Sequence, residues 1–209
     1  MLWKETDAVR TPHATCTLVR AGSKNILVDP GLPPVVIAAR LHERTGLKPE
    51  QIDTIFLTSA RPAHRAGIGA FKKAVRFIHE VELKTSMQYL EAMLAETDDA
   101  DDRATVQREI DSLSTLKAAD DKLAPQVDLF PLPGFTAGTC GLLISATTHT
   151  VLLATDAVPT QDHLLAGQVL PGCANLEQAK ESLSEVYEIA DVIVPGHDNV
   201  FLNPRNYGR

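Results

Sequence analysis

Short apolar runs alternate with amphipathic stretches along the chain, a pattern typical of a mixed α/β protein. Runs rich in Val, Ile, Leu and Phe that end in turn residues predict buried strands. Arg20–Ser23 is a turn sequence between two such runs, so we expect the first two strands to form a hairpin. The strands expected from the pattern are Thr15–Val19, Lys24–Val28, Ile52–Leu57, Ala74–Ile78, Val127–Leu132, Leu142–Ser145, Val151–Ala154 and Asp191–Val194.

Helical spacing of apolar residues predicts the helices between these strands. One helix should begin at Pro33–Pro34 and end before Gly46 and Pro49. Its inward-facing side chains are expected to be Val35, Val36, Ala39 and Leu41. The other expected helices are one that begins within Gly67–Lys72, then Thr85–Leu94, Arg103–Lys117, and Leu176–Glu188 with Asn175 as its cap.

The chain has 209 residues, and we expect one domain that spans residues 1–209. Residues of about 85–122 are too few for a core of their own, so we interpret them as a helical insertion. Their acidic segment Asp98–Asp102 is expected to be a solvated turn and helix start.

Amino-acid composition and net charge limit the kinds of molecule that the chain is expected to bind. The chain is 44% hydrophobic and 22% charged, as in a globular protein. Its net charge is −7 and its pI about 5.5, so we expect no attraction to nucleic acid or to an anionic membrane. The sequence has no long apolar run and no signal-peptide start, which favours a cytoplasmic protein. The three cysteines, Cys16, Cys140 and Cys173, are expected to be reduced.

Five segments of the chain carry the candidate chemistry. In Ile52–Phe71 (IDTIFLTSARPAHRAGIGAF), a strand-like run leads into a polar turn that contains Ser59, Arg61 and His64. The other four segments each end a predicted strand or form the turn after one, where loops gather functional groups. They are NILVDPGLP (Asn25–Pro33), PLPGFTAGTCGLLI (Pro131–Ile144), VLLATDAV (Val151–Val158) and DVIVPGHDNVF (Asp191–Phe201).

In this order the segments resemble the metallo-β-lactamase superfamily, in particular its glyoxalase-II-like hydrolases, which place T-H-x-H-x-D-H after such a strand. The resemblance implies an αββα sandwich of four layers. On the family pattern Ser59 takes the position of the first His, Arg61 that of the second and Ala63 that of the Asp. His64 matches the pattern, whereas Phe135 stands where the family has a further His.

The resemblance also implies a ligand set. His64, Asp156 and His197 match the ligands of one metal position, and two imidazoles with one carboxylate suit a single divalent ion. Asp29 would orient the site turn. With the histidines of the other position replaced, we expect at most one metal, which could be zinc, iron or manganese. The chain would then be a divergent hydrolase that activates water on a small ester, thioester or similar molecule.

Arg61 supports an alternative that the sequence leaves open. A fixed cation at this position could replace the charge of the metal by pairing with Asp156, with Arg65 as a second positive charge nearby. Phe135 would fill the vacated space. The protein would then be a metal-free pseudoenzyme, or a domain that binds a small anionic ligand. The loss of the carboxylate at Ala63 weakens catalysis more than binding.

Overall fold

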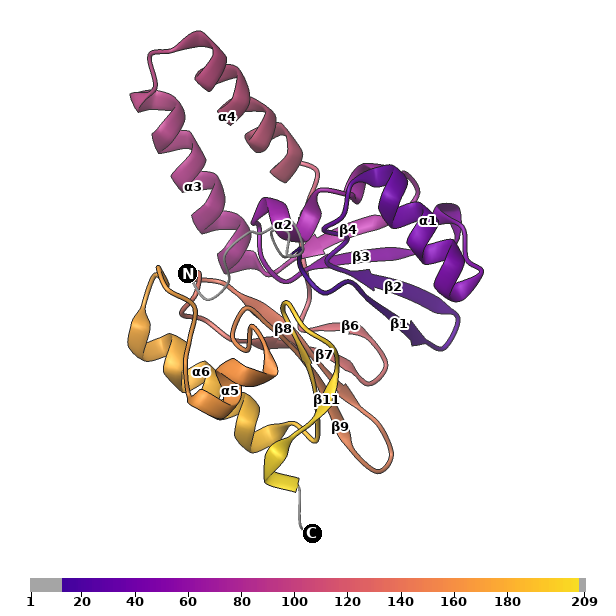
Figure 1. Cartoon of the computed structure of the whole chain (residues 1–209). Helices are drawn as coiled ribbons and strands as arrows, with labels where there is room; N and C mark the ends of the chain where they lie inside the picture. The colour runs from indigo at the N-terminus through magenta and orange to yellow at the C-terminus, as the bar shows by residue number, and fades with distance from the viewer. Residues whose placement is uncertain (1–12, 207–209) are drawn as a thin grey trace, which may run out of the picture.

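The computed structural model describes residues 13–206, which fold into two β-sheets with helices on their outer faces (Figure 1). The first sheet has the strand order β1-β2-β3-β4-β5 and the second β11-β10-β9-β8-β7-β6. The strands are β1 (Thr17–Ala21), β2 (Lys24–Val28), β3 (Thr54–Leu57), β4 (Val75–Ile78), β5 (Lys117–Ala118), β6 (Lys122–Ala124), β7 (Val127–Pro131), β8 (Cys140–Ser145), β9 (Thr150–Thr155), β10 (Val192–Pro195) and β11 (Phe201–Leu202). The helices are α1 (Pro34–Thr45), α2 (Pro62–Arg65), α3 (Glu80–Glu96), α4 (Ala100–Leu113), α5 (Gln161–Ala166) and α6 (Leu176–Ile189), with 3₁₀ turns η1 (Pro49–Gln51), η2 (Ile68–Ala70) and η3 (Pro204–Asn206).

The pairing of the strands decides which loops become neighbours. The expected hairpin of β1 and β2 is present, and β2, β3, β4 and β5 then run parallel. In the second sheet β6 to β9 are antiparallel, whereas β10 runs parallel to β9. Parallel neighbours end at the same edge of a sheet. The loop after β2 therefore lies beside the loop after β3, and the loop after β9 beside that after β10.

Alternating side chains of the central strands divide the core into layers. Ile55 and Leu57 of β3 pack in one cluster with Leu41 of α1. Phe56, between them in sequence, faces the other way and packs with Leu153 of the second sheet. On the far face of that sheet, Leu152 and its neighbours pack against α6. The order helix, sheet, sheet, helix confirms the expected αββα sandwich.

Helix α1 buries a different face from the one predicted. Ile37 and Leu41 are its buried side chains, whereas Val35 is 83% exposed. The prediction was therefore right for Leu41 and wrong for Val35, Val36 and Ala39. Residues four apart share one helix face and residues two apart do not, so once Ile37 faces the sheet Val35 must face solvent.

The helix predicted to begin within Gly67–Lys72 was also placed wrongly. The structure has α2 at Pro62–Arg65, and only the short turn η2 follows Gly67. Proline suits the first helical position because its φ angle is already helical and its missing N–H would have no partner there. The helix therefore begins at Pro62, which brings His64 into the first turn after the site loop.

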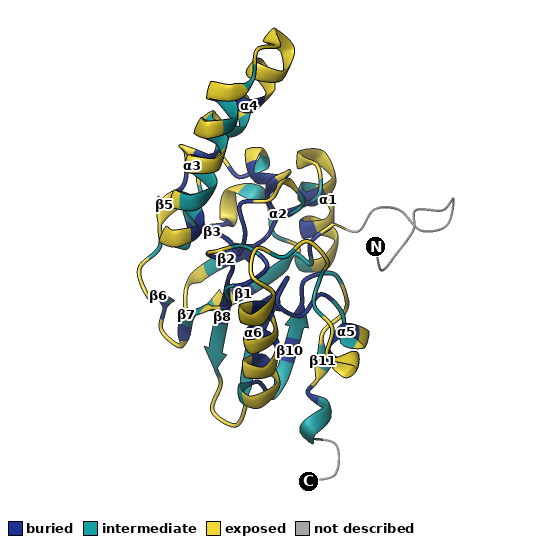
Figure 2. Cartoon of the chain, turned by 90° about the vertical axis from the view of Figure 1, so that its left-hand side faces the viewer, coloured by how far each residue is buried: buried dark blue, intermediate teal, exposed yellow. Residues whose placement is uncertain are grey.

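Helices α3 and α4 form a hairpin that projects from the sandwich and is largely exposed along its length (Figures 1 and 2). The hairpin overlaps the insertion predicted at about 85–122, but α3 begins before it, at Glu80. Lys117–Ala118, predicted as the end of a helix, pair with β4 as β5. Asp99 caps α4 by accepting hydrogen bonds from the backbone N–H groups of Asp101 and Asp102, as expected for an acidic helix start. None of the helices within residues 13–206 is long and apolar enough to cross a membrane.

Candidate metal centre

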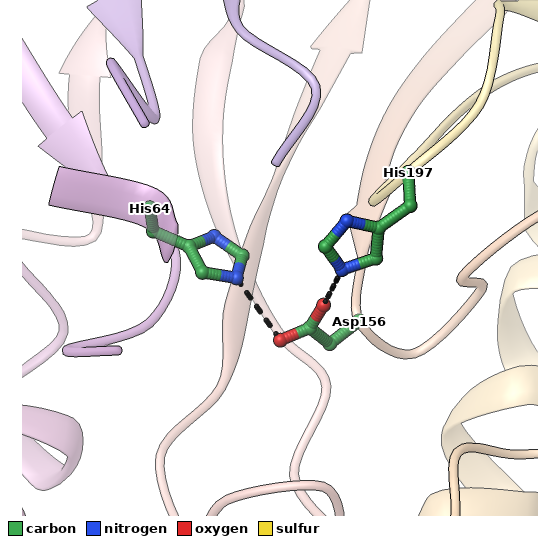
Figure 3. Close-up of side chains that lie close together, drawn as sticks. All are labelled: His64, Asp156 and His197. Atoms are coloured by element: carbon green, nitrogen blue, oxygen red, sulfur yellow. Dashed lines mark hydrogen bonds and ion pairs between the residues drawn. The ribbon is translucent and has the colours of Figure 1, made fainter. Parts of the chain in front are cut away.

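His64, Asp156 and His197 come from both halves of the chain and meet at the edge where the parallel strands end (Figure 3). His64 lies in α2, Asp156 directly follows β9, and His197 follows β10. His64 Nε2 lies 3.1 Å from Asp156 Oδ2, and His197 Nε2 lies 2.9 Å from Asp156 Oδ1. One donor atom from each of the three residues lies within 4.8 Å of the others, a spacing that one ion could span.

Hydrogen bonds at Nδ1 fix the orientation of both imidazole rings. His64 Nδ1 lies 3.0 Å from Asp29 Oδ2, and His197 Nδ1 lies 3.1 Å from the backbone oxygen of His13. These oxygens accept a hydrogen bond, so each Nδ1 donates and each Nε2 faces Asp156. Such outer hydrogen bonds orient imidazole ligands in metal sites. The donor set and its support therefore fit a divalent ion.

Asp29 is fixed in turn by the end of β3. Its two carboxylate oxygens accept hydrogen bonds from Thr58, at 2.9 Å from the backbone N–H and 2.6 Å from the hydroxyl. Asp29 has a φ of 50°, a left-handed conformation that Asp tolerates better than most residues. A single buried carboxylate thus connects the turn after β2, the end of β3 and the ring of His64.

The charges of this cluster depend on one another. Burial alone lowers the pKa of His64, but the carboxylates of Asp29 and Asp156 raise it to about 10. Burial raises the pKa of Asp156, yet His64 and His197 reverse this and hold that pKa well below its usual range. In the metal-free protein, His64 is therefore a cation between two carboxylates.

Arg61 and Arg65 do not supply that positive charge. Arg61 is exposed, and its guanidinium carbon lies 4.6 Å from the centre of the Phe135 ring in a cation–π contact. The pairing of Arg61 with Asp156 expected for the metal-free alternative is wrong: within residues 13–206 the ion-pair partners of Asp156 are His64 and His197. Arg65 turns towards α4, where it contacts Glu109 and donates to Ser112 Oγ at 3.0 Å.

Sequence reasoning missed Glu82, a residue of α3 that is 1% exposed. Its Oε1 accepts from Ser59 Oγ at 3.1 Å and from the backbone N–H of Ala60 at 2.9 Å. Its Oε2 accepts from Thr136 Oγ1 at 2.6 Å and from the backbone N–H of Gly138 at 3.3 Å. One buried side chain therefore connects the loop of Ser59 to the turn that follows Phe135. In the sequence Glu82 looks like any acidic residue in a first helical turn, which gives no signal of this role.

A cleft of about 600 Å³ adjoins the cluster. His197 lines it from the loop after β10, together with side chains of the β1–β2 hairpin and α1. Its volume lies within the range of small-molecule sites.

The fold and site together define an αββα protein with a three-residue candidate metal site at the strand ends. A sequence profile of the metallo-beta-lactamase superfamily matches residues 10–197, so the chain belongs to that superfamily. Comparison with curated proteins gives no match.

Solved structures agree on the fold. The dizinc quorum-quenching lactonase AidC has a TM-score of 0.70 and 18% identity, over 90% of this chain and 74% of the lactonase. A candidate metallo-beta-lactamase from Thermotoga maritima has a TM-score of 0.68 and 18% identity, over 95% of this chain and 93% of its own. An N-acyl homoserine lactone hydrolase has a TM-score of 0.64 and 21% identity, over 88% and 80%. At these identities the likeness concerns the fold.

Proposed function

We propose that this chain is a hydrolase that works with one divalent metal ion, held by His64, Asp156 and His197. The observation that carries the proposal is that the Nε2 atoms of His64 and His197 both face Asp156. Their Nδ1 atoms are hydrogen-bonded to other protein oxygens, which fixes the two rings. Zinc, iron or manganese would suit two imidazoles and a carboxylate. When bound, such an ion lowers the pKa of a water ligand and polarises a carbonyl oxygen.

The protein residues have separate tasks in this proposal. Asp29 fixes the ring of His64, and the backbone oxygen of His13 fixes that of His197, so the ligands are arranged in advance. His64 must lose its Nε2 proton before that atom can bind an ion. Ala63 offers no carboxylate to orient water, so we expect slower turnover than in relatives that have one there.

We further propose that a second metal position is absent. Ser59, Arg61 and Phe135 offer no imidazole at the positions where the family has histidines. Ser59 donates its hydroxyl hydrogen to Glu82, and Arg61 stacks on Phe135. All three side chains thus contact other protein groups, which supports the binding of at most one metal ion per chain.

The proposed substrates are small esters, thioesters and lactones. Structural neighbours described as lactonases support the last of these. The cleft beside His197 would hold the remainder of the molecule.

The test uses protein purified without a histidine tag. Elemental analysis gives its metal content, and a panel of lactones, esters and thioesters is assayed for hydrolysis. We expect one equivalent of metal and chelator-sensitive turnover. His64→Ala should abolish both, whereas His149→Ala, which alters an exposed histidine, should change neither. Two tightly bound equivalents, or full activity of His64→Ala, would contradict the proposal.

The rival function is a metal-free, non-catalytic domain. The contacts of His64 favour it, because an imidazolium between Asp29 and Asp156 would offset part of their buried negative charge without an ion. In this alternative His64, rather than Arg61, replaces the charge of the metal. This function would be supported if the protein purified from cells contains no metal and if neither chelators nor added zinc change its melting temperature.

A further inference from the structure

The cleft beside His197 has an apolar floor. Side chains of β1, β2, α1 and the loop between β2 and α1 form it, which places hydrocarbon next to the candidate metal centre. The apolar residues that line it are Leu18, Leu27, Leu32, Ile37 and Leu41. Leu18 and Leu32 are half-buried there, so contact with an apolar part of a ligand would remove their hydrocarbon from water, above the buried Leu27, Ile37 and Leu41.

Two arginines line the same cleft. Arg40 and Arg44 both belong to α1 and are four residues apart, so their side chains lie on one face of the helix. Asp198 also lines the cleft, but its carboxylate already accepts backbone hydrogen bonds from Asn199 at 2.7 Å and Gln161 at 3.3 Å. The two guanidinium groups therefore give the α1 side of the cleft an affinity for anions.

Arg40 pairs with Glu43 at 2.8 Å, but the pair lies at the surface. The two side chains are 57% and 62% exposed. Exposed pairs of this kind are weak, so the carboxylate of a ligand can compete with Glu43 for the guanidinium.

We propose that this cleft binds an amphiphilic carboxylate, with its apolar tail on the leucine-rich floor and its carboxylate at Arg40 and Arg44. A carboxylate suits the fork of a guanidinium, and a single negative charge suits a protein of net charge −7 better than a polyanion does. One part of this proposal rests on the proposed function. If the protein is a hydrolase, the bond that it cleaves in such a substrate would lie near His197, and the carboxylate of the substrate would lie away from it, at Arg40 and Arg44.

The probes are octanoate and octan-1-ol, which differ in the charged head, and their binding is measured by calorimetry at fixed ionic strength. We expect octanoate to bind one site per chain and octan-1-ol to bind about tenfold more weakly. Butyrate, which lacks four methylene groups, should bind at least about tenfold more weakly than octanoate if the tail contacts the floor.

Variants of α1 give effects of opposite sign. Arg40→Gln and Arg44→Gln should each weaken octanoate binding about threefold to tenfold and leave octan-1-ol unchanged. Glu43→Gln removes the competitor of Arg40 and should tighten octanoate binding about twofold to threefold. Arg108→Gln, an exposed arginine of α4, is the matched control and should have no effect.

Several outcomes would overturn the proposal: no octanoate binding at about 10 mM, equal affinity for the two probes, or arginine variants without effect. Loss of octanoate binding in His197→Ala but not in the arginine variants would also overturn it, by placing the carboxylate at the metal centre. Binding that follows the expected pattern in a protein without turnover would refute only the proposed hydrolysis.

Discussion

Thr155 holds an uncommon backbone conformation directly before the candidate ligand Asp156. Its φ is 55°, and within residues 13–206 its buried hydroxyl has no hydrogen-bond partner. A β-branched residue rarely adopts a positive φ, and such strain costs about 1–3 kcal/mol. Only the structure shows that Thr155 adopts a conformation typical of glycine.

Thr155→Gly should therefore maintain or raise the free energy of unfolding, by up to about 1 kcal/mol, because glycine adopts this conformation without strain. Urea unfolding measures the change. Thr54→Gly, in the middle of the first sheet, is the control and should lose about 1–3 kcal/mol. Equal losses in the two variants would show that Thr155 is not strained.

Glu82 determines how α3 joins the two loops at the candidate site. Its carboxylate faces four donors, and an amide would direct its own N–H₂ group at some of them. Glu82→Gln should therefore lower the free energy of unfolding by about 2–3 kcal/mol. Glu80→Gln, an exposed change in the same helical turn, should cost less than about 0.5 kcal/mol. A Glu82→Gln variant as stable as Glu80→Gln would show that the four hydrogen bonds contribute little.

Asp191 joins the start of β10 to β9 and to η3. The backbone N–H of Thr150 donates to it at 2.8 Å, the Thr150 hydroxyl at 3.1 Å and Asn206 at 3.2 Å. The Thr150 backbone hydrogen bond is the main cause that lowers the pKa of Asp191.

A carboxyl whose pKa is lower in the folded than in the unfolded state stabilises the fold above its unfolded pKa, near 4 for Asp. That stability is lost as the pH falls through the folded pKa. We expect the unfolding free energy of Asp191→Asn to fall less steeply with acid than that of the unmodified protein below about pH 4. Parallel pH profiles for the two proteins would show that Asp191 does not titrate in this way.

Local patterns predicted most elements because the apolar runs in this chain are short and clearly bounded. The strands β3, β4 and β9 and the cap of α6 at Asn175 lie where the pattern placed them, within a few residues at most. The partners of Glu82 and Arg65 could not be predicted, since these contacts join residues far apart in sequence. The buried face of α1 was missed because the exposed Val35 and the buried Ile37 are equally apolar, and only docking on the sheet distinguishes them.

At the scale of the whole molecule, the candidate site lies between the two halves of the chain. Asp29 and His64 belong to the half that forms most of the first sheet, and Asp156 and His197 to the half that forms the second. The order of the motifs indicated this convergence, because each motif ends a strand of the predicted sandwich. The motifs could not indicate that Arg61 would stack on Phe135. The direction of the Arg61 side chain depends on how the folded chain packs around Asp156.

A metal ion at this position would hold the two halves together, and it would bind the folded chain far better than the unfolded one. Zinc at 100 times its dissociation constant would then stabilise the fold by about 2.7 kcal/mol, which raises the melting temperature of a protein of this size by roughly 5–10 °C. We expect this shift in thermal melts of the unmodified protein and its reversal by a chelator. His197→Ala should lose most of the shift, because three protein ligands leave little redundancy. His149→Ala should keep it. A shift of the same size in His197→Ala would place the bound zinc elsewhere on the protein and remove His197 from the site.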